Sequence, residues 1–153
     1  MRRYGEKLSS LLLTMWVGGL WVVGYLVVPV LFSSLDRMLA GAVAGKLFEL
    51  IAWLGLLVSA LLLLFSVHSQ RRLMWQAPVI WLLCSMACLT ALQLFLIQPE
   101  IARLKLLAVL SAPELGPGSA IFARWHAGAS LVYLLQSLLG IGLVLWSERL
   151  FKR

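Results

Sequence analysis

Charged residues, cysteines and histidines are scarce in this chain. Of its 153 residues only 12% are charged, and there are two cysteines and two histidines. Two cysteines four residues apart in an apolar run leave nothing for a disulfide framework to hold together. Hydrophobic residues make up 62% of the chain, and its mean hydropathy is +0.97. A soluble domain cannot bury that much apolar surface, so we expect lipid to be the solvent.

The groupings that carry most enzyme chemistry are also missing. The sequence has no nucleophile, base and acid set, no glycine-rich phosphate loop and no paired catalytic carboxylates. A formal charge of +7 would suggest nucleic acid for a soluble protein, but the basic residues lie mainly beside long apolar runs. The sequence therefore gives no positive support for an enzyme, and we expect neither a resident cofactor nor a nucleic-acid partner.

Four apolar stretches are long enough to cross a bilayer as helices. About 20 apolar residues span a hydrocarbon core of roughly 30 Å, and all backbone amides must pair internally there. The basic amino terminus resembles the start of a signal peptide, but the stretch after it is too long and lacks a cleavage site. The sequence predicts one integral membrane domain over 1–153, an all-α bundle of four transmembrane helices. The predicted spans are 8–32, 46–67, 78–97 and 125–146.

Lysine and arginine are unevenly distributed between the two sides of this predicted bundle. An even number of spans returns the chain to the side on which it began, and short cytoplasmic loops carry the excess of basic residues. This rule predicts that both termini are cytoplasmic. The cytoplasmic basic residues are then Arg2, Arg3, Lys7, Arg71, Arg72, Arg149, Lys152 and Arg153, against Arg37, Lys46, Arg103, Lys105 and Arg124 outside.

The two outer connections carry helical signals of their own. Ser33 and Asp36 have the spacing of a helix start, which predicts a short outer helix over 35–45 that runs into the second span. Residues 99–112 repeat apolar positions at helical spacing, so they either lie on the outer membrane surface or extend the third span. Proline and glycine in 113–119 predict a loop.

Small residues at helical spacing are the candidates for packing between the spans. Because lipid tails are as apolar as leucine, helices in a bilayer associate through close contacts at small residues and a few hydrogen bonds. We expect these residues to support a compact bundle. The candidates are Thr14, Gly18, Gly41, Gly45, Gly55, Ser59 and Gly140.

Polar residues in the predicted outer half form the candidate site. Glu49 lies about one turn inside a span, where an ionisable group is costly unless it is paired or hydrated. The simpler interpretation is that Glu49 reaches the outer interface beside Lys46. The alternative is an outward-facing pocket, with Glu49 near Arg124 or His126. This outer polar cluster comprises Glu49, Gln93, Gln98, Arg124, His126, Ser130 and Tyr133.

Haem and copper are the cofactors that the sequence leaves open. Imidazole binds both, but His68 and His126 lie at opposite ends of the predicted spans, roughly 30 Å apart, which argues against a shared site. His126 alone remains a candidate ligand. Cys84 and Cys88 share a helix face and suit Cu(I), although no third ligand lies at their depth, and packing is the simpler role for them.

Five short motifs stand out along the chain: WVGG at 16–19, PVLF at 29–32, AGAVAGKLF at 40–48, QPEIARL at 98–104 and FARWHAGAS at 122–130. They resemble those of the transmembrane protein 205-like proteins, also known as domain of unknown function 4149. The likeness implies a four-span membrane protein of a family without an assigned activity, here a bacterial member. A eukaryotic relative is associated with resistance to a platinum drug. Copper-resistance D proteins and membrane haem-binding oxidases are more distant, since they carry an early histidine that this chain lacks.

Three hypotheses of function follow. The first is a non-enzymatic protein of the bacterial inner membrane that binds or helps to move a small solute, or serves as a partner subunit, through the outer polar cluster. The second is a haem or copper protein that uses His126. The third is a structural or assembly subunit that packs through its small-residue faces against another membrane protein or a second copy of itself.

Overall fold

A computed structural model describes residues 2–68, 78–110, 112, 114 and 116–151. The side chains of 2–6, 66–68, 78 and 147–151 are outside this description. The described chain contains helices and no strand, and the structure is 94% helical. Four helices are long and apolar enough to cross a membrane: Lys7–Ser34, Arg37–Phe65, Val79–Leu110 and Ala120–Trp146. The predicted all-α transmembrane bundle is therefore confirmed.

Some of the topology signals lie outside the described residues. The structure does not describe four basic residues, Arg71, Arg72, Lys152 and Arg153. It also does not describe the side chains of Arg2, Arg3 and Arg149, or that of His68. The predicted excess of lysine and arginine on the side of the two termini therefore rests on the sequence alone.

The first span is one helix interrupted by a wider turn. It consists of α1 (Arg2–Trp21), the π-helix η1 (Val22–Val27) and α2 (Val28–Ser34). At the end of η1 the amide of Val28 donates to the carbonyl of Val23, five residues earlier. Pro29 follows directly. Proline has no amide to donate and its ring crowds the preceding turn, so a wider turn before it keeps the helix continuous.

The second span begins after a break of two residues. Leu35 is extended, with φ −122° and ψ 160°, and α3 runs from Arg37 to His68. The Asp36 carboxylate caps this helix by accepting the amides of Met38 at 2.9 Å and Leu39 at 3.0 Å. Ser33 therefore belongs to the end of α2 rather than to a helix start, and residues 37–45 form the first turns of the second span.

The third span repeats the arrangement of the first. It consists of α4 (Pro78–Leu92), the π-helix η3 (Gln93–Ile97) and α5 (Gln98–Leu110), and Pro99 follows the π-turn. The amide of Gln98 donates to the carbonyl of Gln93. Of the two alternatives for 99–112, the structure has the extension of the third span as far as Leu110.

The fourth span is a single helix, α6 (Ala120–Phe151). Its first turn is capped by Ser119, whose hydroxyl accepts the amide of Phe122 at 3.0 Å. The helix has 32 residues and is thus about 48 Å long, so it extends beyond a hydrocarbon core of roughly 30 Å.

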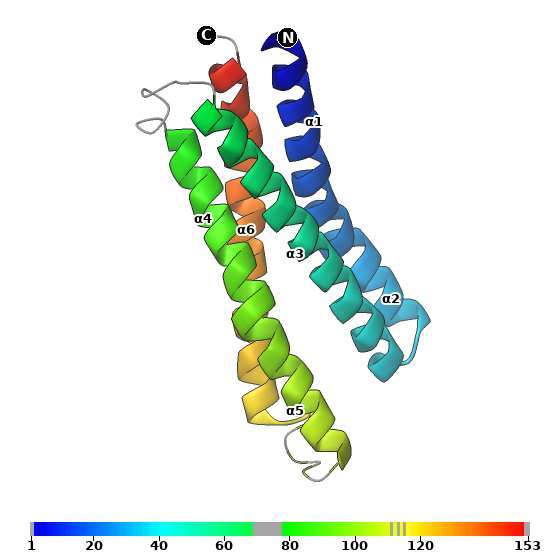
Figure 1. Ribbon diagram of the computed structural model, residues 1–153. Coiled ribbons are helices and arrows are strands. Elements are labelled where there is room, and N and C mark those ends of the chain that lie inside the picture. The colour runs from blue at the N-terminus through cyan, green and yellow to red at the C-terminus, as the bar shows by residue number, and fades with distance from the viewer. Residues whose placement is uncertain (1, 69–77, 111, 113, 115, 152–153) are drawn as a thin grey trace.

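The helices form a four-membered ring, in which α1 packs on α3 and α6, and α4 packs on the same two helices. Both termini lie at one end, hereafter the terminal end (Figure 1). At the opposite end, hereafter the loop end, α2 packs on α3 while α5 packs on α6, and the two pairs diverge (Figure 1). The loop end carries the connections that the charge pattern predicts to be outside.

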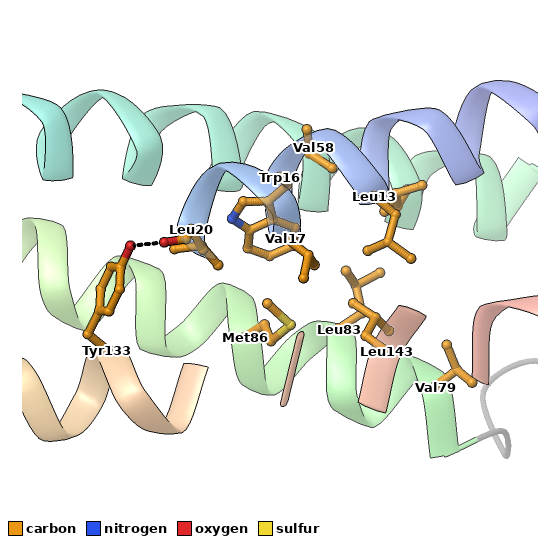
Figure 2. Packing of buried hydrophobic residues seen from close by; sticks show 11 residues of the cluster. Leu13, Trp16, Val17, Leu20, Val58, Val79, Leu83, Met86, Tyr133 and Leu143 are labelled. Atoms are coloured by element: carbon orange, nitrogen blue, oxygen red, sulfur yellow. Dashed lines mark hydrogen bonds between the residues drawn. The ribbon is translucent and has the colours of Figure 1, made fainter. Parts of the chain in front are cut away.

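The main hydrophobic core lies between the terminal end and the middle of the bundle. Trp16, Leu20 and Met86 are among its most buried members, at 0%, 2% and 0% exposed. Figure 2 shows them between the two helix pairs, with Leu143 and Val79 toward the terminal end. A smaller cluster of Ile97, Ile101 and Ala129 joins η3 and α5 to α6 nearer the loop end.

Candidate functional site

The structure does not gather the outer polar cluster around Glu49. The Glu49 carboxylate accepts a hydrogen bond from Lys46 Nζ at 3.0 Å on the same helix, and its side chain is 45% exposed. Among the described side chains, Lys46 is the ion-pair partner of Glu49. This arrangement agrees with the simpler interpretation, in which Glu49 lies beside Lys46. The structure thus does not bring Glu49 to Arg124 or His126.

The cluster residues near the start of α6 are turned outward. Arg124, His126 and Ser130 are all exposed. His126 stacks on Phe122 of its own helix at a centroid distance of 6.1 Å, and the Ser130 hydroxyl donates to the carbonyl of His126 at 3.0 Å. Gln98 is half-buried at the start of α5. These side chains lie on the surface of α5 and α6 and do not line an interior pocket.

Tyr133 is buried and links the two helix pairs. Its hydroxyl donates to the carbonyl of Leu20 at 2.6 Å, shown as the dashed line in Figure 2. Its ring meets Phe48 edge-on at 5.0 Å, and a Cβ at Gly24 would overlap it. The ring therefore occupies the space that a side chain at position 24 would fill, beside the π-turn of η1.

Three neutral polar side chains are buried in the interior, on α4, η3 and α6, and two of them are hydrogen-bonded to each other. Gln136 Nε2 donates to Thr90 Oγ1 at 2.5 Å, and Thr90 Oγ1 donates in turn to the carbonyl of Met86 at 2.8 Å. Gln93 follows Thr90 by three residues, which places it on the same helix face. We name Thr90, Gln93 and Gln136 the core polar site. Of its members, sequence reasoning identified Gln93 and missed Thr90 and Gln136.

Gln93 is the member of this site with an unmet hydrogen-bonding group. The residue is 6% exposed, and its Oε1 atom has no hydrogen-bond partner among the described residues. Trp16 Nε1 is likewise buried and unpaired among the described side chains. A polar atom buried without a partner costs about 1–3 kcal/mol, so such atoms are rare in folded proteins. Gln93 also opens the π-segment η3, and π-turns occur frequently at functional sites.

A hollow lies along α6 on the side of η3. It is open to the surface, and its volume is about 380 Å³. Arg124 is its cationic member, and Gly128, at its middle, has no neighbouring atom within 4 Å of a Cβ position. The lining residues are Ile97, Ile121, Arg124, Trp125, Gly128 and Val132.

The predicted packing residues differ in what they touch. A Cβ at Gly55 would overlap the Trp16 indole, and one at Gly140 would lie 3.1 Å from Val17 Cγ1. Gly41 approaches Lys105, whose Nζ donates to the Gly41 carbonyl at 3.2 Å. Gly18 and Gly45 have no such neighbour within 4 Å, and the Thr14 and Ser59 hydroxyls bond within their own helices.

The candidate metal ligands are dispersed. Among the described residues, no three histidine, cysteine, aspartate or glutamate side chains are grouped so that they could hold a metal ion. Cys84 is half-buried, Cys88 is exposed, and both are free thiols. His126 has Phe122 as its ring neighbour, and the side chain of His68 is outside the described residues.

Comparison with known proteins identifies a family. Residues 11–110 match the family described as Domain of unknown function (DUF4149), which covers the first three spans. No curated protein and no solved structure matches the chain. Together with its four apolar helices, this match shows that the chain is a multi-pass membrane protein that belongs to the DUF4149 family.

Proposed function

We propose that this protein binds a small neutral solute at the core polar site and catalyses no reaction there. The observation that carries the proposal is the unpaired Oε1 atom of Gln93, buried near the middle of the third span. The proposal keeps the binding role expected from the sequence but moves it from the outer polar cluster to the interior of the bundle.

The physical argument is one of unsatisfied hydrogen bonding. The hydrocarbon region offers no water to a buried carbonyl, and each unpaired group there costs several kcal/mol. Gln93 is thus suited to accept a hydrogen bond from a hydroxyl, amide or amine that enters the bundle. Thr90 and Gln136 already bond to each other, so they would shape the site without competing for the same donor.

The neutrality of the site indicates the kind of solute. Thr90, Gln93 and Gln136 carry no charge, and among the described residues Gln136 hydrogen-bonds to Thr90, and Thr90 to the Met86 carbonyl, rather than to an ionisable side chain. A charged solute would therefore lose its hydration without a counter-charge. Thr90, Gln93 and Gln136 include no ionisable acid or base that could activate the Thr90 hydroxyl, so the site fits binding better than covalent chemistry.

We also propose the bacterial inner membrane as the location, with both termini in the cytoplasm, and a place among the transmembrane protein 205-like members of the family. The distribution of lysine and arginine in the sequence supports the orientation.

Access of a small polar probe to Gln93 tests the proposed function. The native thiols are first removed by Cys84→Ala and Cys88→Ala, and Gln93→Cys or Met86→Cys is then added. Met86 is the matched control, because it is 0% exposed and lies two turns away on the same span. The full chain in lipid vesicles is treated with 2-hydroxyethyl methanethiosulfonate, a neutral polar reagent, and labelling is followed by mass spectrometry.

We expect Gln93→Cys to react many times faster than Met86→Cys, because the site admits a small neutral reagent and the hydrophobic core around Met86 does not. Circular dichroism confirms that both variants keep their helices. Equal labelling rates at the two positions would show that no solute reaches Gln93, and the proposal would then be abandoned.

A further inference from the structure

We infer that the hollow along α6 binds one anionic phospholipid from the leaflet at the loop end, with its phosphate on Arg124 and an acyl chain along the apolar lining. This lipid site is separate from the core polar site and does not depend on the proposed function. It is argued from the charge, shape and position of the hollow.

The charge of the hollow comes from Arg124, which has no acidic partner among the described residues. Three other cations at the loop end are engaged: Lys46 with Glu49, Arg103 with Glu100 at 3.4 Å, and Lys105 with the Gly41 carbonyl. Arg37 is exposed but lies outside the hollow. A free guanidinium presents a planar pair of donors that matches a phosphate group. Arg124 therefore favours an anionic head group at the mouth of the hollow.

The remainder of the hollow is apolar and outward-facing. Ile97 forms its floor and is 7% exposed, whereas Ile121 and Trp125 are 47% and 38% exposed on its edges. Gly128 has no side chain and no neighbour within 4 Å of its Cβ position, which leaves the middle of the hollow open. A hydrocarbon chain fits this lining, whereas an inorganic anion would leave it uncovered.

The length and position of the hollow match one leaflet. From Ile121 to Val132 the helix rises about 16 Å, which is close to half of a hydrocarbon core of roughly 30 Å. Arg124 is the fifth residue of α6, so it lies near the loop end of the span. Trp125 beside it is the residue type that settles at the level of lipid head groups.

Lipid selectivity of the purified chain tests this inference. The full chain is placed in phosphatidylcholine vesicles with trace spin-labelled phosphatidylglycerol or spin-labelled phosphatidylcholine, and electron paramagnetic resonance gives the immobilised fraction of each. We expect selective immobilisation of phosphatidylglycerol. Arg124→Gln should lower its relative association about tenfold, the loss expected for a charge-assisted pair of hydrogen bonds. Arg37→Gln is the matched control, an exposed arginine outside the hollow, and should leave selectivity unchanged.

A second pair of variants tests the shape of the hollow. Gly128→Leu should fill it and reduce the immobilised phosphatidylglycerol, whereas Gly18→Leu adds the same side chain at another open glycine on α1 and should not. Excess inorganic phosphate should not displace the lipid, because phosphate cannot replace the chain contacts. Any one of three results would overturn the inference. They are an equal loss of phosphatidylglycerol selectivity in Arg124→Gln and Arg37→Gln, no loss of immobilised phosphatidylglycerol in Gly128→Leu, and displacement of the lipid by phosphate.

Discussion

Two glycines allow large aromatic side chains to reach the neighbouring helix in the core. The Trp16 indole lies where a side chain at Gly55 would be, and the Tyr133 ring occupies the corresponding space at Gly24. Each contact joins helices that are distant in sequence, α1 with α3 and α6 with η1. Because lipid provides no hydrophobic force between helices, such close contacts contribute much of the association energy.

Gly55→Ala is therefore expected to destabilise the bundle. The added methyl group would overlap Trp16, which is 0% exposed and has no free space to move into. Overpacking of this kind costs about 1–3 kcal/mol. Denaturant unfolding in detergent, followed by tryptophan fluorescence, measures the loss. Gly18→Ala is the control, since nothing lies within 4 Å of its Cβ position; equal stability of the two variants would contradict the packing argument.

At the residue scale, the sequence predicts which types of residue serve in packing or hydrogen bonding better than it predicts which residues they contact. Small-residue spacing pointed to Gly55 and Gly140, which touch another helix, but also to Gly18 and Gly45, which do not within 4 Å. The difference depends on which face each helix turns to its neighbour. Glutamine inside an apolar span is a polar signal that applies to Gln136 as well as to Gln93. The bond between Gln136 and Thr90 requires the approach of α4 and α6, which spacing does not reveal.

At the scale of the helix, the predicted spans are shorter than the observed ones. Hydropathy predicts only the segment that lies in the hydrocarbon core. The helix itself extends further, as long as its backbone amides have hydrogen-bond partners, so α3 begins at Arg37 and α6 at Ala120. Capping side chains set these starts. The sequence located the region around Asp36 but assigned the cap to Ser33, because both residue types are common at that position.

Asp36→Ala is expected to weaken the start of α3. The substitution removes the carboxylate that accepts the amides of Met38 and Leu39, and loss of such a cap costs about 1 kcal/mol. Hydrogen exchange of the first turn of α3, measured in detergent, should become faster while the core remains protected. Asp36→Asn should retain most of the protection, because asparagine caps nearly as well. Equal exchange in Asp36→Ala and the unmodified protein would contradict this role.

At the scale of the whole molecule, four spans return the chain to its starting side. The termini lie together in Figure 1, and the ring of α1, α3, α4 and α6 closes around the core. The number and order of spans followed from the sequence, because apolar runs of this length have one stable arrangement in a bilayer. The divergence of the helix pairs at the loop end did not, since it depends on packing between residues far apart in the chain.

Reporter fusions test the orientation. Green fluorescent protein fluoresces in the cytoplasm and alkaline phosphatase is active only outside it, so fusions at both ends should fluoresce and lack phosphatase activity. The physical reason is the excess of basic residues assigned to that side. A phosphatase fusion after Ser119, in the loop before α6, is the positive control. Opposite results at the two termini would refute the four-span topology, and phosphatase activity at both would reverse its direction.

The two π-segments also set the rotational phase of the loop-end half. Each residue in an α-helix turns the chain by about 100°, so the extra residue held in a π-turn offsets all later side chains by that angle. If Val22–Val27 wound as a regular α-helix with no residue removed, Pro29 and the rest of α2 would swing around the axis by that angle. A relative shorter by one residue there could wind as a regular α-helix and still present the same stripe of α2 to α3.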